Sequence, residues 1–385
     1  MRYNPPAMFL KHIELTDFRN YETLSVDFTA KKVILLGNNA QGKTNLLEAI
    51  NMLATGKSAT AHKDSELVRF GAPQAVIRSE VQRELTDAGI DMLIRTHGRR
   101  AVRINGVSQK RLADLFGKVL VVLFRSEDLQ LVKGGPAERR SYLDQMLVQL
   151  SGSHYQHLHD FDRVATQRNH LLRAIGEGQA TVDQLESWNE QLIHFAMAIW
   201  RRRIQLIEAL APRVAHWHEQ ISEGKEKLSL RYVPSIELGP DPDQWEANIR
   251  KALEELQRRE IGRGQTMVGP HRDDMELLIN DHPARSFGSQ GQQRTVVLAL
   301  KLAELDYVRE MADESPLLLL DDVLAELDVR RQNALLASIG DNVQTFVTST
   351  HLNDFSAAWL EQADIYRVET GELKLMKSMK DTPKG

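Results

Sequence analysis

An eight-residue segment near the N-terminus has the residue types and spacing of a phosphate-binding loop. It fits the pattern G-x4-G-K-[ST] with Gly37, Asn38, Asn39, Ala40, Gln41, Gly42, Lys43 and Thr44. Glycines let backbone amides wrap the β- and γ-phosphates of a nucleotide, and the helix that follows adds a favourable dipole. Lys43 supplies a point charge to the same phosphates, and the hydroxyl of Thr44 is a hard ligand for Mg²⁺. The segment therefore predicts a nucleoside triphosphate site.

A pair of carboxylates at the end of an apolar run is the matching second half of such a site. Residues 316–320 read Pro-Leu-Leu-Leu-Leu and are followed by Asp321 and Asp322. A buried strand delivers such residues at its carboxyl end, where open α/β sheets bind ligands. We expect Asp321 to hold Mg²⁺, directly or through water, and Asp322 to polarise the attacking water.

Three weaker signals lie in the same half of the chain. Ser289 can cap a helix whose first-turn amides, at Gly291 and Gln292, could face an anion, although an ordinary helix cap explains these residues equally well. The acidic stretch 325–328 and His351, which follows the apolar strand candidate 343–349, are also unspecific alone. They gain weight from their order: phosphate-binding loop, serine–glycine helix start, carboxylate pair, acidic loop, histidine.

That order resembles the head of an ABC-type ATPase. In those proteins a Ser-Gly-Gly-Gln signature of one subunit closes over the γ-phosphate bound by the other. The resemblance implies ATP as cofactor, an ATP-dependent homodimer, nucleotide contacts from Ser289, Gly291 and Gln292, and a catalytic role for His351. Gln290 stands where the signature usually has glycine, and Asp322 stands where glutamate is usual. Because Asp is one methylene shorter than Glu, we expect slow, switch-like hydrolysis.

Further stretches are similar to one branch of these ATPases. Residues 15–21 and 45–50 resemble SMC-related heads, and four others resemble the RecF family of bacterial recombination mediators: 103–106, 124–140, 269–274 and 287–295. RecF-like proteins share both departures from the signature. The resemblance runs over residues 8–375, so Met8 is the expected start. It adds Arg19 to the nucleotide contacts and implies weak DNA-stimulated ATPase activity, gapped or junction DNA, RecR and RecO as partners, and help in loading recombinase.

The elements needed to position these residues alternate between strand and helix. The expected strands are 13–15, 33–36, 90–96, 100–104, 119–124, 274–279, 317–320 and 343–349, and the expected helices include 244–260, 290–312 and 329–339. Such alternation favours an α/β fold with a largely parallel sheet. Asn105-Gly106 predicts a hairpin turn.

The middle of the chain is predicted to be an inserted helical arm on the ATPase head. The helical pattern runs from Pro136 to about Gln220, with a break at residues 176–178. The heptad register drifts and Pro212 interrupts it, which favours a helical hairpin over a long coiled coil. We expect the head to be formed by residues 1–138 and 264–385 and the arm by residues 139–263. The Q-loop is expected within residues 125–128.

The net charge of −4 is unevenly distributed, at +5 over residues 1–138, −1 over 139–263 and −8 over 264–385. A DNA surface is therefore expected in the first third, near the predicted hairpin, at Arg99, Arg100, Arg103, Lys110 and Arg111. Further candidates are Arg139, Arg140 and Arg201 to Arg203. A solvated surface explains each group as well.

The composition excludes several other classes of protein. No cysteine is present, which excludes disulfides and thiolate sites and fits a reducing compartment. The longest aliphatic run, 317–320, is far below the roughly 20 apolar residues of a membrane span, and no secretory signal opens the chain. We therefore expect a cytoplasmic protein. A transporter ATPase subunit would need a short gap before the signature, whereas 244 residues (45–288) intervene here. An SMC-like clamp would need longer coiled-coil arms, and a P-loop kinase would not need the signature.

Overall fold

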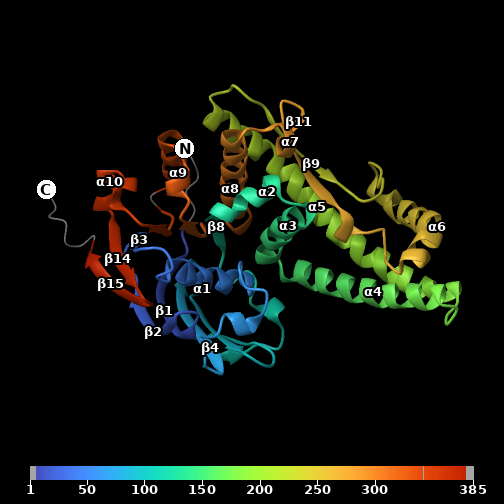
Figure 1. Ribbon diagram of the computed structural model, residues 1–385, viewed down its shortest axis with the longest axis horizontal. Coiled ribbons are helices and arrows are strands. Elements are labelled where there is room, and N and C mark those ends of the chain that lie inside the picture. The colour runs from blue at the N-terminus through green and yellow to red at the C-terminus, as the bar shows by residue number, and fades with distance from the viewer. Residues whose placement is uncertain (1–5, 341, 379–385) are drawn as a thin grey trace. The chain divides into compact units, whose positions relative to one another are not determined.

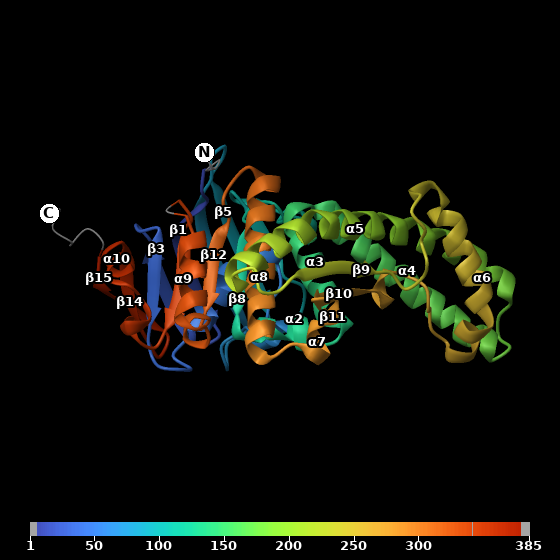
Figure 2. The same cartoon turned by 90° about the horizontal axis from the view of Figure 1, so that it is seen from above.

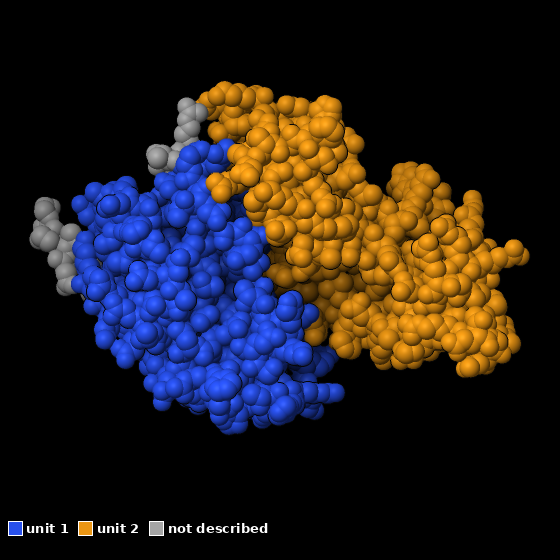
Figure 3. All heavy atoms as spheres, in the orientation of Figure 1, with its two compact units in different colours: residues 1–128, 297–385 blue, residues 129–296 orange. Residues whose placement is uncertain are grey.

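The computed structural model describes residues 6–340 and 342–378 and divides into two compact units (Figure 3). The first unit comprises residues up to 128 and from 297 onward, and the second comprises residues 129–296. Met8 is the expected start of the chain, and residues 1–5 before it lie outside the described residues. These boundaries differ from the expected ones because residues 129–138 and 264–296 belong to the helical unit. Strand β10 (Asp274–Ile279) pairs antiparallel with β9 (Leu228–Val233), which follows the long helices.

A six-stranded sheet forms the centre of the first unit. Its order is β15-β14-β3-β13-β12-β8, and all strands but β15 run parallel. Figure 2 shows β14, β3, β12 and β8 in a row. The bounds are β3 (Lys32–Leu36), β8 (Val121–Arg125), β12 (Leu317–Asp321), β13 (Thr345–Ser349), β14 (Ala363–Glu369) and β15 (Glu372–Lys377). The predicted parallel sheet is confirmed, although β14 and β15 were not among the expected strands.

The first unit also holds an antiparallel sheet of order β2-β1-β4-β5-β6-β7 (Figure 1). Its strands are β1 (Phe9–Phe18), β2 (Tyr21–Asp27), β4 (Gln74–Gln82), β5 (Ala88–Arg95), β6 (Ala101–Ile104) and β7 (Val107–Ser108). Ile13 and Leu15 are buried as their alternation predicts. The hairpin at Asn105-Gly106 is confirmed, since both residues have left-handed φ values, 50° and 78°.

Helix α1 (Lys43–Thr55) packs on the parallel sheet, against β8, β12 and β13. Eleven of its residues are buried, as is typical of a helix in the middle of a core. A buried amide joins the two sheets: Gln344 accepts the N–H of Leu10 at 2.6 Å and donates to the Leu10 carbonyl at 3.2 Å. The remaining helices of this unit are α9 (Val329–Ser338), α10 (Ala357–Glu361) and the part of α8 (Gln290–Ala312) from residue 297.

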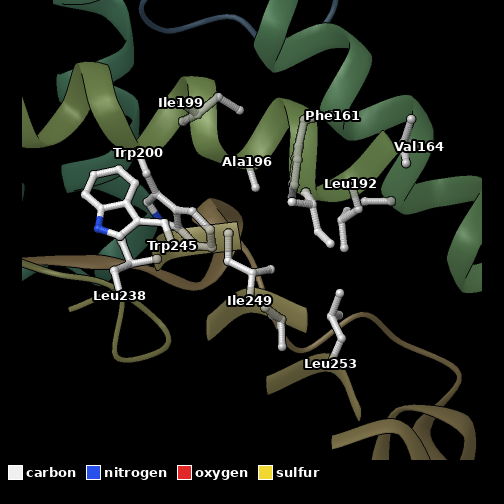
Figure 4. Close-up of a cluster of buried hydrophobic side chains, with 13 residues drawn as sticks. Phe161, Val164, Leu192, Ala196, Ile199, Trp200, Leu238, Trp245, Ile249 and Leu253 are labelled. Atoms are coloured by element: carbon white, nitrogen blue, oxygen red, sulfur yellow. The ribbon is translucent and has the colours of Figure 1, made fainter. Parts of the chain in front are cut away.

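The second unit is mainly helical. Its helices are α2 (Gln130–Lys133), α3 (Pro136–Leu150), α4 (Gly152–Gly176), α5 (Glu186–Ser222), α6 (Trp245–Arg263) and α7 (Ala284–Phe287), with a small sheet β11-β10-β9 in which β11 is His282–Pro283. Side chains of α4, α5 and α6 form one apolar core, which includes Phe161, Trp200 and Ile249 (Figure 4). Of the helices within the described residues, none is long and apolar enough to cross a membrane.

Helix α5 contains Pro212 and continues to Ser222, so the proline interrupts the heptad register without ending the predicted helix. Proline lacks the N–H of a normal helical bond. The side chain of the next residue, Arg213, donates to the carbonyl of Ala209 in this turn, and packing of α5 on α4 holds the rest of the helix.

The stretch 269–274 forms the polar centre of the helical unit. Asp273 is buried and accepts hydrogen bonds from the Trp200 indole, the Tyr232 hydroxyl and, at 2.7 Å, the Ser235 N–H. Burial raises the pKa of the Asp273 carboxyl despite these donors. This network accounts structurally for a stretch that the sequence had marked only by resemblance.

Candidate nucleotide site

The phosphate-binding loop joins β3 to α1 in the first unit. Gly42 caps α1 with φ of 119°, a conformation that favours glycine. A Cβ at Gly37 would lie 2.4 Å from the carbonyl oxygen of Val368 on β14, so only glycine fits there. The glycines of the motif are therefore required by the backbone of this chain.

Two neighbouring turns hold the loop in place. From the β1–β2 turn, the Asn20 amide donates to the Gln41 carbonyl at 2.8 Å and the Tyr21 hydroxyl donates to the Gly42 carbonyl at 2.9 Å. From the β14–β15 turn, the N–H of Gly371 donates to the Gln41 carbonyl at 3.0 Å, and the N–H of Thr370 donates to the side-chain oxygen of Gln41 at 2.8 Å. Sequence reasoning missed these supports: it marked the 15–21 stretch by resemblance but gave no role to Asn20 or Tyr21.

Lys43 and Thr44 have distinct partners at the start of α1. The ammonium of Lys43, whose residue is 3% exposed, donates to the carbonyls of Gly37 and Asn38 at 2.7 and 3.1 Å. The hydroxyl of Thr44 donates to Oδ1 of Asp321 at 3.0 Å. The two halves of the predicted site, 277 residues apart in sequence, therefore meet at the carboxyl edge of the parallel sheet.

Asp321 and Asp322 are linked by a threonine that the sequence analysis did not single out. Thr348 lies near the end of β13, which is placed between β3 and β12, and its hydroxyl is 2.9 Å from Oδ1 of Asp321 and 3.1 Å from Oδ1 of Asp322. It also accepts the N–H of Asp322 at 2.7 Å. A polar residue at the end of a buried strand beside the carboxylates was the signal that could have found it.

The two carboxylates differ in their surroundings. Burial raises the pKa of Asp321 to about 6, the charge of Asp322 adds to this shift, and hydrogen bonds from Thr348 and Thr44 oppose it. Asp322 has φ of 53°, a left-handed conformation that Asp and Asn tolerate better than most residues and that often marks functional sites.

The donors at this edge fit a small hard cation bound together with phosphates. Within the described residues, no cluster of three or more His, Cys, Asp or Glu could hold a metal alone. Thr44 and Asp321 nevertheless place two oxygen ligands 3.0 Å apart. Mg²⁺ is usually held by one or two protein ligands plus substrate phosphates and water, so these two residues suffice.

Arg19, a predicted nucleotide contact, is tied into the protein in this structure. Its guanidinium donates to both carboxylate oxygens of Glu48 on α1, at 2.8 and 3.0 Å, and to Thr60 and the Glu66 carbonyl. Burial raises the pKa of Glu48, but hydrogen bonds from Arg19, Ser58 and Thr60 outweigh it and hold that pKa below its usual value. Arg19 thus braces α1 next to the loop.

His351 and the Q-loop candidate, two further predictions in the first unit, lie at the same sheet edge. His351 follows β13, its side chain is exposed, and its backbone bonds with the Ser349 hydroxyl. The Q-loop candidate 125–128 follows β8, the neighbour of β12, and Glu127 contributes to the raised pKa of Asp321. Topology therefore brings all of these residues to the strand ends that carry the carboxylates.

The signature candidates lie in the second unit and form a reciprocal helix cap. The hydroxyl of Ser289 accepts the N–H of Gln292 at 3.2 Å, and the side-chain oxygen of Gln292 accepts the N–H of Ser289 at 2.7 Å. A Cβ at Gly288 would lie 2.6 Å from the Ala284 carbonyl, so glycine is needed before the cap. Gly291 lies in the first turn of α8.

The predicted DNA-binding residues do not form one free cluster. Arg100 is paired with Asp64, Arg111 is paired with Asp114 at 3.3 Å, and Arg103 lies opposite Asp91 in the sheet.

The further candidates lie in the helical unit. Arg139 and Arg203 are buried and form ion pairs with Asp274 and Asp144, so they are structural. Arg140 donates to the Asp273 carbonyl at 2.8 Å, and Arg202 donates to Ser153 at 2.8 Å. Exposed side chains remain at Arg99, Arg103, Lys110, Arg111 and Arg201.

Known proteins resemble the chain over nearly its whole length. The family model described as RecF/RecN/SMC N terminal domain matches residues 9–374. The DNA replication and repair protein RecF of Cyanothece sp. (strain PCC 7425 / ATCC 29141) is 45% identical over 368 residues, which cover 94% of this chain and 97% of that protein. RecF of Gloeobacter violaceus (strain ATCC 29082 / PCC 7421) is 44% identical over 371 residues, 95% of this chain and 98% of that protein.

Solved structures agree with the sequence relatives. A structure of "the recombination mediator protein RecF-ATP in RecFOR pathway" superposes with a TM-score of 0.90 at 31% identity, covering 98% of this chain and 100% of the other. A Smc head domain from Pyrococcus furiosus, at 16% identity and a TM-score of 0.54, shares the fold. The fold is thus the α/β head of an ABC/SMC-type ATPase, as predicted. The chain belongs to the RecF family.

Proposed function

We propose that this protein is an ATP-driven, DNA-binding switch of recombinational DNA repair and replication. The observation that carries the proposal is the Thr44–Asp321 hydrogen bond, which joins the phosphate-binding loop to the carboxylate strand. Relatives named for DNA replication and repair, and the RecF-ATP structure, support the same function. ATP and Mg²⁺ are the proposed cofactors.

Each residue of the nucleotide site has a proposed task. The loop 37–44 cradles the β- and γ-phosphates, Lys43 leaves the loop carbonyls to donate to them, and Thr44 and Asp321 hold Mg²⁺. The cation would neutralise charge on the phosphates. Asp322 accepts a hydrogen bond from the attacking water, and His351 lies at the same edge to contact the γ-phosphate. Arg19 positions α1 and contacts the nucleotide.

A hollow beside the start of α1 is the proposed place for the base and ribose. It has a volume of about 610 Å³ and is lined by residues that include Asn20, Asn45, Phe70 and Thr96. Asn20 also bonds to the loop at Gln41, so the hollow adjoins the phosphate site. Polar amides and one aromatic ring suit a nucleoside.

The signature is proposed to act on the nucleotide of a second copy of the chain. Ser289, Gly291 and Gln292 offer a hydroxyl and helix-start amides to a γ-phosphate. ATP would then join two heads, and the dimer would bind gapped or junction DNA, hydrolyse ATP weakly in a DNA-stimulated manner, and act with RecR and RecO in loading recombinase. The cytoplasm is the proposed location.

DNA binding combined with molecular sizing tests this function. In the presence of ATP or a non-hydrolysable analogue, the protein should elute as a dimer and bind duplex or gapped DNA, and without nucleotide it should be monomeric and bind weakly. Equal DNA affinity and a single size under all conditions would refute an ATP-driven switch.

A further inference from the structure

The carboxamide of Gln292 is held at both ends. Its oxygen accepts the N–H of Ser289 at 2.7 Å, and its nitrogen donates to Oε1 of Glu226 at 2.8 Å. A carboxamide has one acceptor end and one donor end, so only one orientation satisfies both partners. Glu226 therefore selects the orientation that closes the reciprocal cap on Ser289.

Glu226 lies in a short loop that is itself anchored. The loop joins α5 to β9 at the top of Figure 1, and the backbone of Lys227 exchanges hydrogen bonds with Asn280, at 2.9 Å to its side-chain oxygen and 2.8 Å from its N–H. Asn280 follows β10, on the segment that leads through β11 and α7 to Ser289. The carboxylate and the signature are therefore fixed to the same small sheet.

A buried histidine lies behind the carboxylate. His218, near the end of α5, is fully buried, and its Nε2 lies 3.6 Å from Oε2 of Glu226. Desolvation lowers the pKa of His218, so the imidazole is neutral at pH 7. A neutral imidazole does not compete as a cation with Gln292 for the carboxylate of Glu226. The side chain of Glu226 is 22% exposed, so its bond to Gln292 is partly shielded from water.

We propose that Glu226 is a positioning residue for the signature. By orienting the Gln292 carboxamide it keeps the Ser289–Gln292 turn preformed, so that less ordering is needed when this turn meets the γ-phosphate of the partner subunit. The inference rests on the proposed function, because it requires the signature to act on nucleotide. Glu226 itself touches neither the nucleotide nor the reacting atoms.

Variants of the full-length protein test the role. Glu226→Ala should raise the ATP concentration at the midpoint of dimerisation about tenfold and lower the turnover at low ATP by a similar factor. This is the effect expected when the partly exposed, charge-assisted bond from Gln292 is lost. Binding of ATP to the monomer should stay unchanged. Glu226→Gln keeps an acceptor for the Gln292 nitrogen and should stay close to the wild type. The side chain of Glu226→Asp is too short to reach Gln292, so this variant should behave like Glu226→Ala. Glu223→Ala, in the same loop but paired with Lys225, is the matched control.

Hydrogen exchange and a double-mutant cycle separate positioning from general damage. The Ser289 amide should exchange faster in Glu226→Ala and Glu226→Asp but not in Glu223→Ala, while the helices of this unit stay protected. The effects of Glu226→Ala and Gln292→Ala should be strongly non-additive, because the first acts through the second. Additive effects, or wild-type dimerisation and exchange in Glu226→Asp, would overturn the inference. If Ser289→Arg dimerises normally with ATP, the proposed function itself fails. If Ser289→Arg no longer dimerises but the Glu226 variants dimerise like the wild type, only the role of Glu226 is overturned.

Discussion

Replacing Thr348 by valine removes one hydroxyl from the site at almost constant shape. That hydroxyl accepts the N–H of Asp322 at 2.7 Å and donates to one of two carboxylates, 2.9 Å away on Asp321 or 3.1 Å away on Asp322. A hydrogen bond to a charged group contributes about 1.5–3 kcal/mol, and the Asp322 N–H would lose its partner as well. Since about 1.4 kcal/mol corresponds to a tenfold change in rate, Thr348→Val should slow turnover about 10- to 100-fold. Loss of this donor also shifts the pKa of Asp321 further upward.

Steady-state ATP hydrolysis at saturating Mg²⁺, with ATP binding measured separately, checks this expectation. Affinity for ATP should change little, because the loop 37–44 and Lys43 are untouched. Thr345→Val is the matched control, since it removes a buried hydroxyl from the other end of the same strand, where Thr345 donates to the Val343 carbonyl at 3.2 Å. Turnover that is unchanged in Thr348→Val, or equally reduced in Thr345→Val, would refute the role given to Thr348.

Lys43→Ala should remove most ATP binding and lower hydrolysis about 10²–10³-fold or more, as measured by nucleotide binding and phosphate release, because a charged donor to the phosphates is removed. Asp322→Asn should keep the left-handed backbone, bind ATP, and accumulate as a dimer without hydrolysis in sizing experiments; normal phosphate release would exclude Asp322 as the residue that orients water. Joint replacement of Arg99, Arg103 and Lys110 by Gln should flatten the slope of log affinity for DNA against log salt, by about 0.9 for each phosphate that is no longer neutralised. Arg100→Gln, which breaks the pair with Asp64, should lower the melting temperature instead.

Local patterns in the sequence were enough to predict the nucleotide half of the site. The loop 37–44 and the carboxylates at 321 and 322 each occupy consecutive residues, and the apolar strands before them place both at one sheet edge. Thr348 stands out in the sequence only as a polar residue at the end of an apolar strand, and its place beside the carboxylates follows from the position of β13 between β3 and β12, which is a non-local property. The supports from Asn20 and Gly371 likewise depend on turns that are distant in sequence from the loop.

The DNA contacts stay predictions, because clusters of basic residues are a less specific signal than motif spacing. Arg100, Arg139 and Arg203 were among the candidates, and each is paired with a carboxylate elsewhere in the chain. Composition does not distinguish an arginine that is paired with a carboxylate from one that is not. The second boundary of the helical unit also depends on a non-local contact, since the pairing of β9 with β10 draws residues after 263 into that unit.

In the proposed dimer, each nucleotide is enclosed by the loop of one subunit and the signature of the other. Mixing two inactive variants, Lys43→Ala and Ser289→Arg, and measuring ATP hydrolysis by the mixture tests it most directly. A mixed dimer has one site with both lesions and one intact site, so activity should partly return, while neither variant alone hydrolyses ATP. Absence of any recovery, although the two variants form mixed dimers, or failure of the Ser289→Arg monomer to bind ATP, would contradict a site shared between two chains.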